Sequence, residues 1–502
     1  MSTPLSSKLL FWPRWFWRQL TSMRTALFLL LLLALAAVPG SVYPQRSADP
    51  NGVRLYFNEQ PELAQLLDAL QLFDVYTSVW FSAIYILLFV SLIGCVLPRT
   101  KVHWQAMLAK PVQTPKNLTR MPAYTTISGS GDIPEVANQT LKKLGFRTER
   151  QGNAVSAERG YIKETGNLVF HYSLIGVLLA VGIGGGFSYS GQRLLVEGDV
   201  FVNNLASYDA FSPGPLFFEG ELQPYSVRLD KFEVVYDLQN LANRGTPIDF
   251  IGTLTKTIDG KVIQDELRVN HPLAVPGANV YLTGNGFAPV ITMRDGNGNI
   301  AFSGPVPFLP QDTNMTSLGV IKAPDAIPEQ IGMIAFFYPT AEQLESGAYT
   351  SIYPDPFIPL MTMNVYKGDL GLDGGIPRSV YALDTNNMEL IAGRNGPNPP
   401  LLLEVGDVVS LPDGLGSVSF DGLLRFASVD IAYNPGGIWV LGFSLIALLS
   451  VMISLLVPRR RVWVRANEDG TIELAALARG DDPKLDDFLL VLKEKLESEI
   501  NK

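Results

Sequence analysis

Four long runs of apolar residues dominate the pattern of this chain. The first is interrupted near its end by Pro39-Gly40, whereas the other three are unbroken and contain no Asp, Glu, Lys or Arg. A helix of about 20 apolar residues is long enough to cross the hydrocarbon core of a bilayer. The pattern therefore predicts four transmembrane helices, at Thr25–Val42, Val79–Leu97, Leu168–Phe187 and Ile438–Val457.

The long region at residues 190–434 has the pattern of β-strands instead. Phe232, Val234 and Tyr236 alternate with polar positions, which is the period of a strand with one buried face. Its length allows one or two sandwich-like cores. We expect helices only at Ile327–Phe337 and Thr340–Glu345, and a seam in the Pro-rich zone Pro305–Pro328. Tight turns are predicted at Asp259-Gly260, Asp295-Gly296, Asp413-Gly414 and Asp421-Gly422.

A small α/β domain is predicted from residues 98–165 and 458–502 together. Its last element repeats apolar residues at helical spacing from Leu485 to Ile500, with Asp482 as the expected N-cap and Pro483 at the first helical position. We expect this helix to pack on the α/β unit rather than on lipid. The fold class is thus an α+β membrane protein. The other expected elements are strands at Tyr124–Ile127, Val462–Ala466 and Thr471–Leu474 and a helix at Ile133–Leu144.

Composition and charge support this picture and add an orientation. A mean hydropathy of +0.17, with 47% hydrophobic and 17% charged residues, is too apolar for an ordinary soluble protein. Basic residues outnumber acidic ones in residues 1–24 (four to none) and 98–165 (eleven to five), while acidic residues dominate in 45–75 (five to two) and 190–434 (28 to 13). The positive-inside rule therefore places both termini and 98–165 in the cytoplasm, and 45–75 and 190–434 outside. The acidic outer region argues against nucleic-acid binding. Arg459, Arg460, Arg461 and Arg465 follow the last span directly and fit its cytoplasmic end.

The first apolar run has a second interpretation. A basic leader, an apolar core and Ala34-Leu35-Ala36 are also features of a cleavable signal peptide. Cleavage would leave the orientation of the other three spans unchanged. The aromatic cluster between Phe11 and Trp17 fits an interfacial belt before a retained helix better.

Few residues are candidates for chemistry. His171 lies inside the third run, where an imidazole is costly without a partner or a ligand; the alternative is a structural hydrogen bond to a neighbouring helix. His103 is expected at the membrane interface and His271 in a turn. The single cysteine, Cys95, excludes an internal disulfide and a CxxC pair, and is either a small buried residue or a redox-active or ligating thiol. No hydrolase, P-loop or dinucleotide motif occurs.

The chain resembles the ResB family, also called CcsB, over essentially its whole length. The resemblance is specific because ordered motifs occur around all four spans. It rests on Met23 to Leu27, Pro39-Gly40-Ser41, Pro44-Gln45, Leu72 to Tyr76, Trp80-Phe81, Leu92 to Cys95, Pro98-Arg99, Leu168 to Leu174, Glu197-Gly198, Val269 to Leu273, Tyr281 and Asn434-Pro435-Gly436.

The resemblance implies a function in System II cytochrome c maturation. In that system ResB, with a multispan partner called ResC or CcsA, carries haem b across the membrane and supports its attachment to apocytochrome c. No tryptophan-rich haem-binding segment like that of the partner occurs in this sequence. The family's intramembrane histidine corresponds to His171, an axial ligand for haem iron, with the second ligand expected from the partner. Arg99, and also Lys101 or Lys163, are candidates for holding the propionates; the alternative is ordinary anchoring of the cytoplasmic ends of the spans by positive charge.

Two functions of different classes follow. In the first, the chain is a non-catalytic or co-catalytic subunit of a cytochrome c haem lyase complex in a bacterial plasma membrane. In the second, it is a membrane-anchored assembly or receptor protein that recruits apocytochrome c or another partner and binds no haem. A stand-alone enzyme is disfavoured because no catalytic constellation is present.

Overall fold

The computed structural model describes residues 11–237, 245–372 and 381–501. The chain forms two compact units, Met1–Gly185 with Pro435–Lys502, and Gly186–Asn434. The first holds the apolar helices and a small α/β domain, and the second is a β domain. Lys8, one of the four basic residues counted before the first span, lies outside the described residues.

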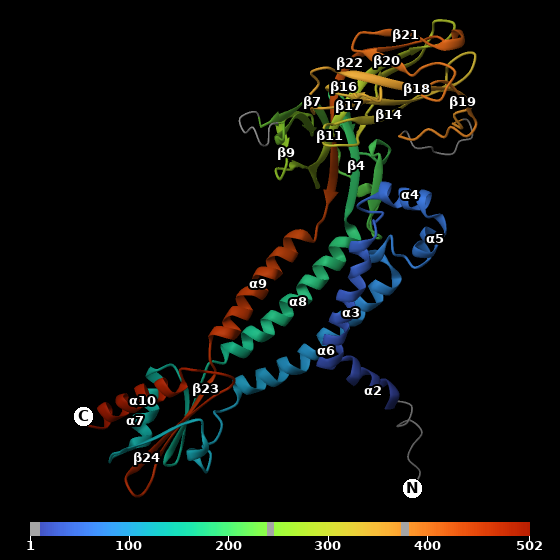
Figure 1. Ribbon diagram of the computed structural model, residues 1–502. Helices are drawn as coiled ribbons and strands as arrows, with labels where there is room; N and C mark the ends of the chain where they lie inside the picture. Colours follow the sequence, from blue (N-terminus) through green and yellow to red (C-terminus); the bar gives the residue numbers. More distant parts are fainter. Residues whose placement is uncertain (1–10, 238–244, 373–380, 502) are drawn as a thin grey trace, which may run out of the picture. The chain divides into compact units, whose positions relative to one another are not determined.

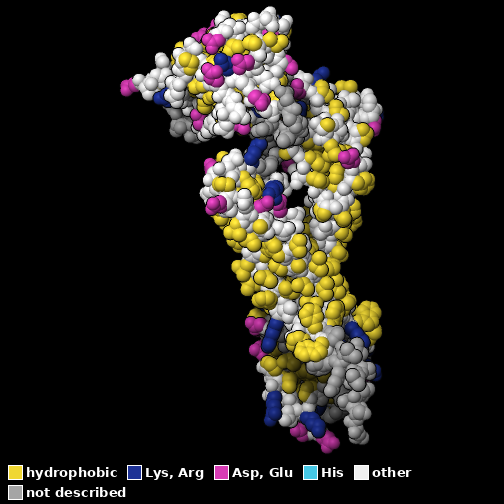
Figure 2. Space-filling view, turned by 90° about the vertical axis from the view of Figure 1, so that its right-hand side faces the viewer, with side chains coloured by type: hydrophobic (Ala, Val, Ile, Leu, Met, Phe, Trp, Pro, Cys, Tyr) yellow, Lys and Arg dark blue, Asp and Glu magenta, His cyan; other side chains and the backbone are white. Residues whose placement is uncertain are grey.

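Among the residues that the structure describes, four helices are long and apolar enough to cross a membrane: α3 (Met23–Val42), α6 (Val79–Leu108), α8 (Ile162–Phe187) and α9 (Gly437–Leu456) (Figure 1). Their positions confirm the four predicted apolar helices, and Figure 2 shows apolar side chains gathered along them. Helix α2 (Phe11–Leu20) precedes α3. Helix α6 runs beyond its predicted end at Leu97, because Pro98 removes only one hydrogen bond of the helix and the chain stays helical to Leu108.

Glycines let α8 and α9 approach closely at both ends. A Cβ at Gly436 would lie 2.3 Å from the carbonyl oxygen of Ala180 and 2.9 Å from the Cα of Gly184. A Cβ at Gly166 would lie 2.8 Å from the carbonyl oxygen of Ser450. The backbones therefore touch where a larger residue would separate them.

Two short helices fold the segment between the first two spans into a compact cap. Helices α4 (Pro50–Glu59) and α5 (Pro61–Ala69) enclose Phe73, which is fully buried. The buried Gln45 side chain ties the cap together, since its Nε2 donates to the carbonyl of Leu72 and its Oε1 accepts from the amide of Val75.

The small α/β domain is one antiparallel sheet covered by two helices. The sheet order is β1-β24-β23-β3-β2, so strands that precede α8 and strands that follow α9 combine in it. The apolar stripe of α10 packs on the sheet through Leu485, Leu489, Leu492 and Leu496. Two details of the prediction are wrong. Lys484 rather than Asp482 is the N-cap of α10, and the helix begins at Leu485 rather than at Pro483; the Asp482 carboxylate pairs with Arg460 instead. The elements are β1 (Ala123–Ser128), α7 (Ile133–Lys143), β2 (Arg147–Gln151), β3 (Ala154–Arg159), β23 (Arg460–Ala466), β24 (Thr471–Ala478) and α10 (Leu485–Ile500).

Within its described residues, the β domain consists of sheets of seven, six, four and two strands. The seven-stranded sheet is β10-β11-β22-β4-β6 with β12 and β21; the six-stranded sheet is β13-β14-β15-β18-β19 with β20; the others are β5-β7-β8-β9 and β16-β17. The strands are β4 (Tyr189–Val196), β5 (Val200–Val202), β6 (Ala210–Pro213), β7 (Ser226–Tyr236), β8 (Pro247–Ile258), β9 (Lys261–Arg268), β10 (Leu273–Val275), β11 (Ala278–Arg294), β12 (Ile300–Pro305), β13 (Leu309–Pro310), β14 (Ser317–Ala323), β15 (Ile331–Tyr338), β16 (Ala341–Gln343), β17 (Tyr349–Ser351), β18 (Leu360–Gly368), β19 (Met388–Ala392), β20 (Leu401–Glu404), β21 (Val408–Ser410) and β22 (Ser417–Tyr433).

The two helices predicted inside this domain are wrong. Strand β15 instead begins within Ile327–Phe337, and strand β16 lies within Thr340–Glu345. Strand β15 pairs with β14 on one side and β18 on the other, and all its residues except Ile334 and Phe336 are buried. Its side chains are therefore continuously apolar, and such a run cannot be distinguished from a buried helix by periodicity alone.

The Pro-rich zone is not a seam between two cores. Val306, Phe308 and Ala326 from this zone lie in one large core. The long strands β11 and β22 contribute to that core and also to a second one around β4, β7 and β8. Asp421-Gly422 is likewise not a turn, because it forms an irregularity within β22, whereas Asp259-Gly260 joins β8 to β9 as predicted.

Candidate functional site

His171 lies on α8, half-buried, in the third turn of the helix. Its Nδ1 is 2.7 Å from the carbonyl oxygen of Asn167, one turn earlier. A carbonyl oxygen only accepts, so Nδ1 donates here, and in the neutral ring this leaves the lone pair on Nε2. Among the residues that the structure describes, Nε2 has no hydrogen-bond partner. The neutral ring is thus held in one tautomer with Nε2 left open.

Hydrogen bonds between α6 and α8 fix the helix on both sides of His171. The Tyr172 hydroxyl lies 2.9 Å from Thr100 Oγ1, and His103 Nε2 lies 3.0 Å from Thr165 Oγ1. Further along the helix, the Tyr85 hydroxyl donates to the carbonyl of Leu178. His171 is therefore carried by a positioned helix, while His103 is already used in an interhelical contact.

The structure does not bring the candidate propionate partners to His171. The Arg99 guanidinium contacts Met23 Sδ, and Lys163 Nζ is 3.5 Å from the carbonyl oxygen of Arg479. Lys101 is exposed. None of the three contacts His171 within the described part of the chain.

Cys95 packs at the turn between α2 and α3. Its Sγ donates to the carbonyl of Thr21 at 3.0 Å, and Ser91 Oγ donates to the neighbouring carbonyl of Leu20. A Cβ at Gly94 would overlap the Thr21 side chain. This geometry gives the Leu92-to-Cys95 motif a packing role. Across residues 11–237, 245–372 and 381–501, no group of three or more His, Cys, Asp or Glu is placed to hold a metal ion.

An ion-pair network at the start of α8 was not predicted. Arg459, only 4% exposed, lies 2.6 Å from Glu164 Oε2 and 3.4 Å from Glu158 Oε2, and its guanidinium stacks 4.3 Å from the centroid of the Tyr161 ring. Glu158 also pairs with Arg461 at 2.8 Å. Burial raises the pKa of Glu158, but the Tyr161 hydroxyl and the two arginines outweigh this and hold its pKa below the ordinary value. In the sequence, this network is indicated only by Glu158 and Glu164, two acidic residues in the basic segment 98–165. The arginines that bind them follow α9, far away in the chain.

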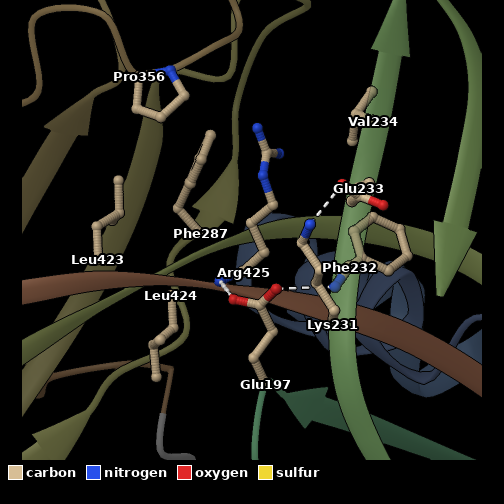
Figure 3. Close-up of a pocket in the computed structure, with 10 residues that line it drawn as sticks. All are labelled: Glu197, Lys231, Phe232, Glu233, Val234, Phe287, Pro356, Leu423, Leu424 and Arg425. Atoms are coloured by element: carbon tan, nitrogen blue, oxygen red, sulfur yellow. Dashed lines mark hydrogen bonds and ion pairs between the residues drawn. The ribbon is translucent and has the colours of Figure 1, made fainter. Parts of the chain in front are cut away.

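The β domain contains a pocket of about 350 Å³ beside β7 and β22 (Figure 3). Glu197 closes its base by accepting from the amides of Phe232 and Arg425 at 2.8 and 3.0 Å. The Arg425 guanidinium lies 4.5 Å from the centroid of the Phe287 ring. His271, by contrast, is exposed and forms a turn with Arg268.

Motifs that are distant in sequence meet in this fold. A Cβ at Gly40 would lie 2.8 Å from the ring of Tyr76, and Gln45 binds the amide of Val75. These contacts, together with those of Glu197 and Gly436, give structural roles to several of the residues on which the resemblance was based.

The architecture defines a class of protein: four apolar helices with a large β domain inserted between the third and fourth, and a histidine with an open nitrogen on the third. Residues 23–489 match the ResB-like family, so the chain belongs to that family.

Curated relatives carry the name cytochrome c biogenesis protein CcsB. The protein of Synechococcus sp. (strain WH7803) is 31% identical over 277 residues, which cover 52% of this chain and 58% of the relative. Those of Prochlorococcus marinus (strain AS9601) and Microcystis aeruginosa (strain NIES-843 / IAM M-2473) are 26% and 27% identical over 278 and 296 residues, covering 52% and 56% of this chain and 59% and 62% of the relatives. The matched part thus spans a little over half of each of these proteins.

Proposed function

We propose that this chain acts in cytochrome c biogenesis as a haem-handling subunit, with His171 as an axial ligand of the transported haem iron. Membership of the ResB-like family and the name of the relatives support the pathway. The observation that carries the haem proposal is the open Nε2 of an imidazole whose Nδ1 is committed to the Asn167 carbonyl. A hydrogen bond of this kind on the non-ligating nitrogen orients a histidine ligand and raises its basicity.

The proposed topology places His171 near the cytoplasmic side. With both termini inside, α8 runs outward, and His171 is in its first half, on the side where haem made in the cell would enter. We place the protein in the plasma membrane with the β domain outside. The second axial ligand would come from a ResC/CcsA-type partner, and apocytochrome c would receive the haem on the outer side.

Haem is the substrate in this proposal, and its chemistry suits the site. Neutral imidazole is a usual axial ligand of haem iron, and the apolar macrocycle is compatible with a helix surface in lipid. The propionates need a polar end to the site, for which Arg99 on α6 remains our candidate, although it contacts Met23 in this structure.

Absorption spectroscopy of the co-purified complex with the partner tests the proposal. His171→Ala should remove or shift the Soret band and lower haem affinity by about tenfold or more, and added imidazole should restore it. Thermal unfolding should change little, because the ring makes a single hydrogen bond.

His103→Ala is the matched control, since His103 already uses its Nε2 on Thr165. Its spectrum should match that of the unmodified complex. A Soret band that is indifferent to His171→Ala would contradict the haem role and favour a receptor that only recruits apocytochrome c.

A further inference from the structure

Residues 214–218 form a loop that hydrogen bonds fix beside the end of α8. The amide of Leu216 donates to the carbonyl of Gly186 at 2.9 Å. The amide of Gly214 donates to the carbonyl of Ser188 at 2.7 Å. The loop is therefore held at the point where the helix, and with it the third apolar run of the sequence, comes to an end.

The side chains of this loop alternate between the interior and the surface. The ring centroid of Phe217 lies 5.6 Å from that of Tyr189 and 5.3 Å from that of Phe211, in the core of the β domain. Its two neighbours, Leu216 and Phe218, are 56% and 60% exposed. Scattered apolar side chains on a soluble surface need no explanation, but these two adjoin a helix that is long and apolar enough to cross a membrane.

Leu216 extends one apolar face of α8. Leu179 and Ile183 are exposed, and Gly186 follows them on the same face of the helix by spacing of four and seven residues. Gly186 is buried because Leu216 lies over it: a Cβ at Gly186 would be 3.0 Å from Leu216 Cδ1. The missing side chain of the glycine is thus replaced by that of Leu216, which continues the face outward.

The start of α9 indicates where the membrane surface lies along α8. A Cβ at Gly436 would lie 2.3 Å from the carbonyl oxygen of Ala180, so α9 begins beside the last two turns of α8. Trp439, in the first turn of α9, is exposed, and tryptophan is enriched at the interface between hydrocarbon and water. We therefore expect the last turns of α8, and the loop bound to Gly186, at this interface.

Charge in this part of the chain favours apolar insertion over attraction to anionic headgroups. The sequence contains no lysine or arginine between Arg193 and Arg228, whereas Glu219 directly follows the loop. Attraction to anionic lipid depends on basic residues near the surface. A lipid would therefore be bound here through its hydrocarbon and not through the charge of its headgroup.

We propose that Leu216 and Phe218 insert into the surface of the lipid bilayer and anchor the β domain there, in addition to its two covalent connections through α8 and α9. Insertion removes both side chains from water. The hydrogen bonds of the loop and the buried Phe217 already fix their direction, so little conformational entropy is lost on insertion. The inference depends on α8 crossing the membrane and is independent of the haem site.

A single fluorescent label tests the insertion in the full chain. Cys95 is the only cysteine, so Cys95→Ser provides a background without thiols in which Phe218→Cys carries a nitrobenzoxadiazole group. In phosphatidylcholine nanodiscs we expect blue-shifted emission, quenching by lipids brominated on their acyl chains and loss of quenching by aqueous iodide. An interfacial helix buries its apolar face about 5–10 Å into the headgroup and acyl boundary, and the label should lie at a similar depth. Addition of anionic phosphatidylglycerol should not change the result.

The same label on Val408→Cys is the control for position. Val408 is 69% exposed on β21 and pairs with Ser419 near the start of β22. The other end of β22, at Tyr433, pairs with Tyr189 next to the loop, which puts the two labels about 45 Å apart along the strand. Figure 1 shows β21 at the end of the β domain away from the start of β4. This label should be quenched by iodide and not by brominated lipid.

Two outcomes would overturn the proposal. Equal iodide quenching of the labels at 218 and 408 would show that the loop stays in water. Protection of the label at 218 from iodide without quenching by brominated lipid would show that protein, such as a second copy of the chain, covers the loop instead.

A charge introduced beside the label tests whether the loop itself inserts. Leu216→Glu should expose the label at 218 to iodide, because a carboxylate is costly in hydrocarbon. Leu402→Glu is the matched control, since Leu402 is also an exposed leucine of the β domain, on β20, and it should leave the label protected. An equal effect of the two variants would contradict local insertion. Because no haem is present in these measurements, their failure leaves the proposed haem function unaffected.

Discussion

Two neighbouring stretches of α8 differ in whether their polar side chains are fully bound by partners. In the first turn, Glu164 lies 2.6 Å from Arg459 and 2.9 Å from Arg479, within a network that also includes Glu158. Two turns later, about 10 Å along the helix, His171 has one nitrogen bound and one open. Both stretches are polar exceptions in an apolar helix, yet only one of them leaves a group available for a ligand.

This difference distinguishes polar groups that stabilise the fold from polar groups that are available to bind a ligand. Buried charges are kept where oppositely charged partners hold them, and the first turn of α8 meets that condition. An imidazole with an unused lone pair in an apolar segment gains nothing for folding from that nitrogen. Substitutions in the ion-pair network should therefore change stability, whereas substitution of His171 should change the haem spectrum.

The largest expected effect is on stability, from Arg459→Ala. Without Arg459, Glu164 loses its closest cation. Glu158, which is only 3% exposed, keeps Arg461 but loses its second cation. Breaking a buried pair in this way costs about 3–5 kcal/mol of unfolding free energy. Circular-dichroism melting of the full chain in detergent, with the rate of proteolysis in the small α/β domain, measures the loss.

Arg479→Ala is the control for this prediction. Arg479 pairs with the same Glu164, but its side chain is 72% exposed, so its loss should cost no more than about 1 kcal/mol. Equal melting temperatures for the two variants would show that burial of Arg459 is not the deciding factor.

A smaller effect is expected from acid. The pKa of Glu158 is lower in the folded protein than its ordinary 4.5, so the unfolded chain binds more protons in this range. The stabilisation from Glu158 is present above its ordinary pKa and is lost as pH falls through its folded pKa. Melting temperatures measured from about pH 6 to about pH 3 should fall, and Glu158→Gln should make the dependence shallower. A slope unchanged in Glu158→Gln would assign acid sensitivity to other carboxylates.

The smallest effect is expected from Cys95→Ser. A serine hydroxyl can donate to the Thr21 carbonyl as the thiol does, so unfolding free energy should change by no more than about 0.5–1 kcal/mol. Cytochrome c maturation in cells should be unchanged. Loss of maturation with unchanged melting would instead support a redox-active or ligating thiol.

Local patterns predicted much of this molecule. The four apolar helices, the helix from Leu485 to Ile500 and the turn at Asp259-Gly260 each follow from residues close together in the chain. Strands from residues 98–165 and 458–502 share one sheet, because each segment has strands with an apolar face and neither is large enough to bury it alone. His171 could be selected from its position in an apolar run.

Other features depended on distant parts of the chain. Strand β15 looked helical because pairing with β14 and β18, which decides its conformation, is not visible in its own run of apolar residues. The arginines after α9 looked like ordinary flanking charges, although Arg459 and Arg461 bind Glu158, which precedes α8 in the chain.

The sequence by itself determined which segments are apolar enough for a membrane, which end in turns and which histidine lies in a span, because hydrophobic periodicity and turn chemistry act over a few residues. Tertiary structure alone decided that the Nδ1 of His171 is bound and its Nε2 is free, that Glu158 and Arg459 form an ion pair, and that Glu197 binds the amides of two different strands. Those outcomes depend on hydrogen-bond partners within about 3 Å, and only the folded chain brings such atoms together.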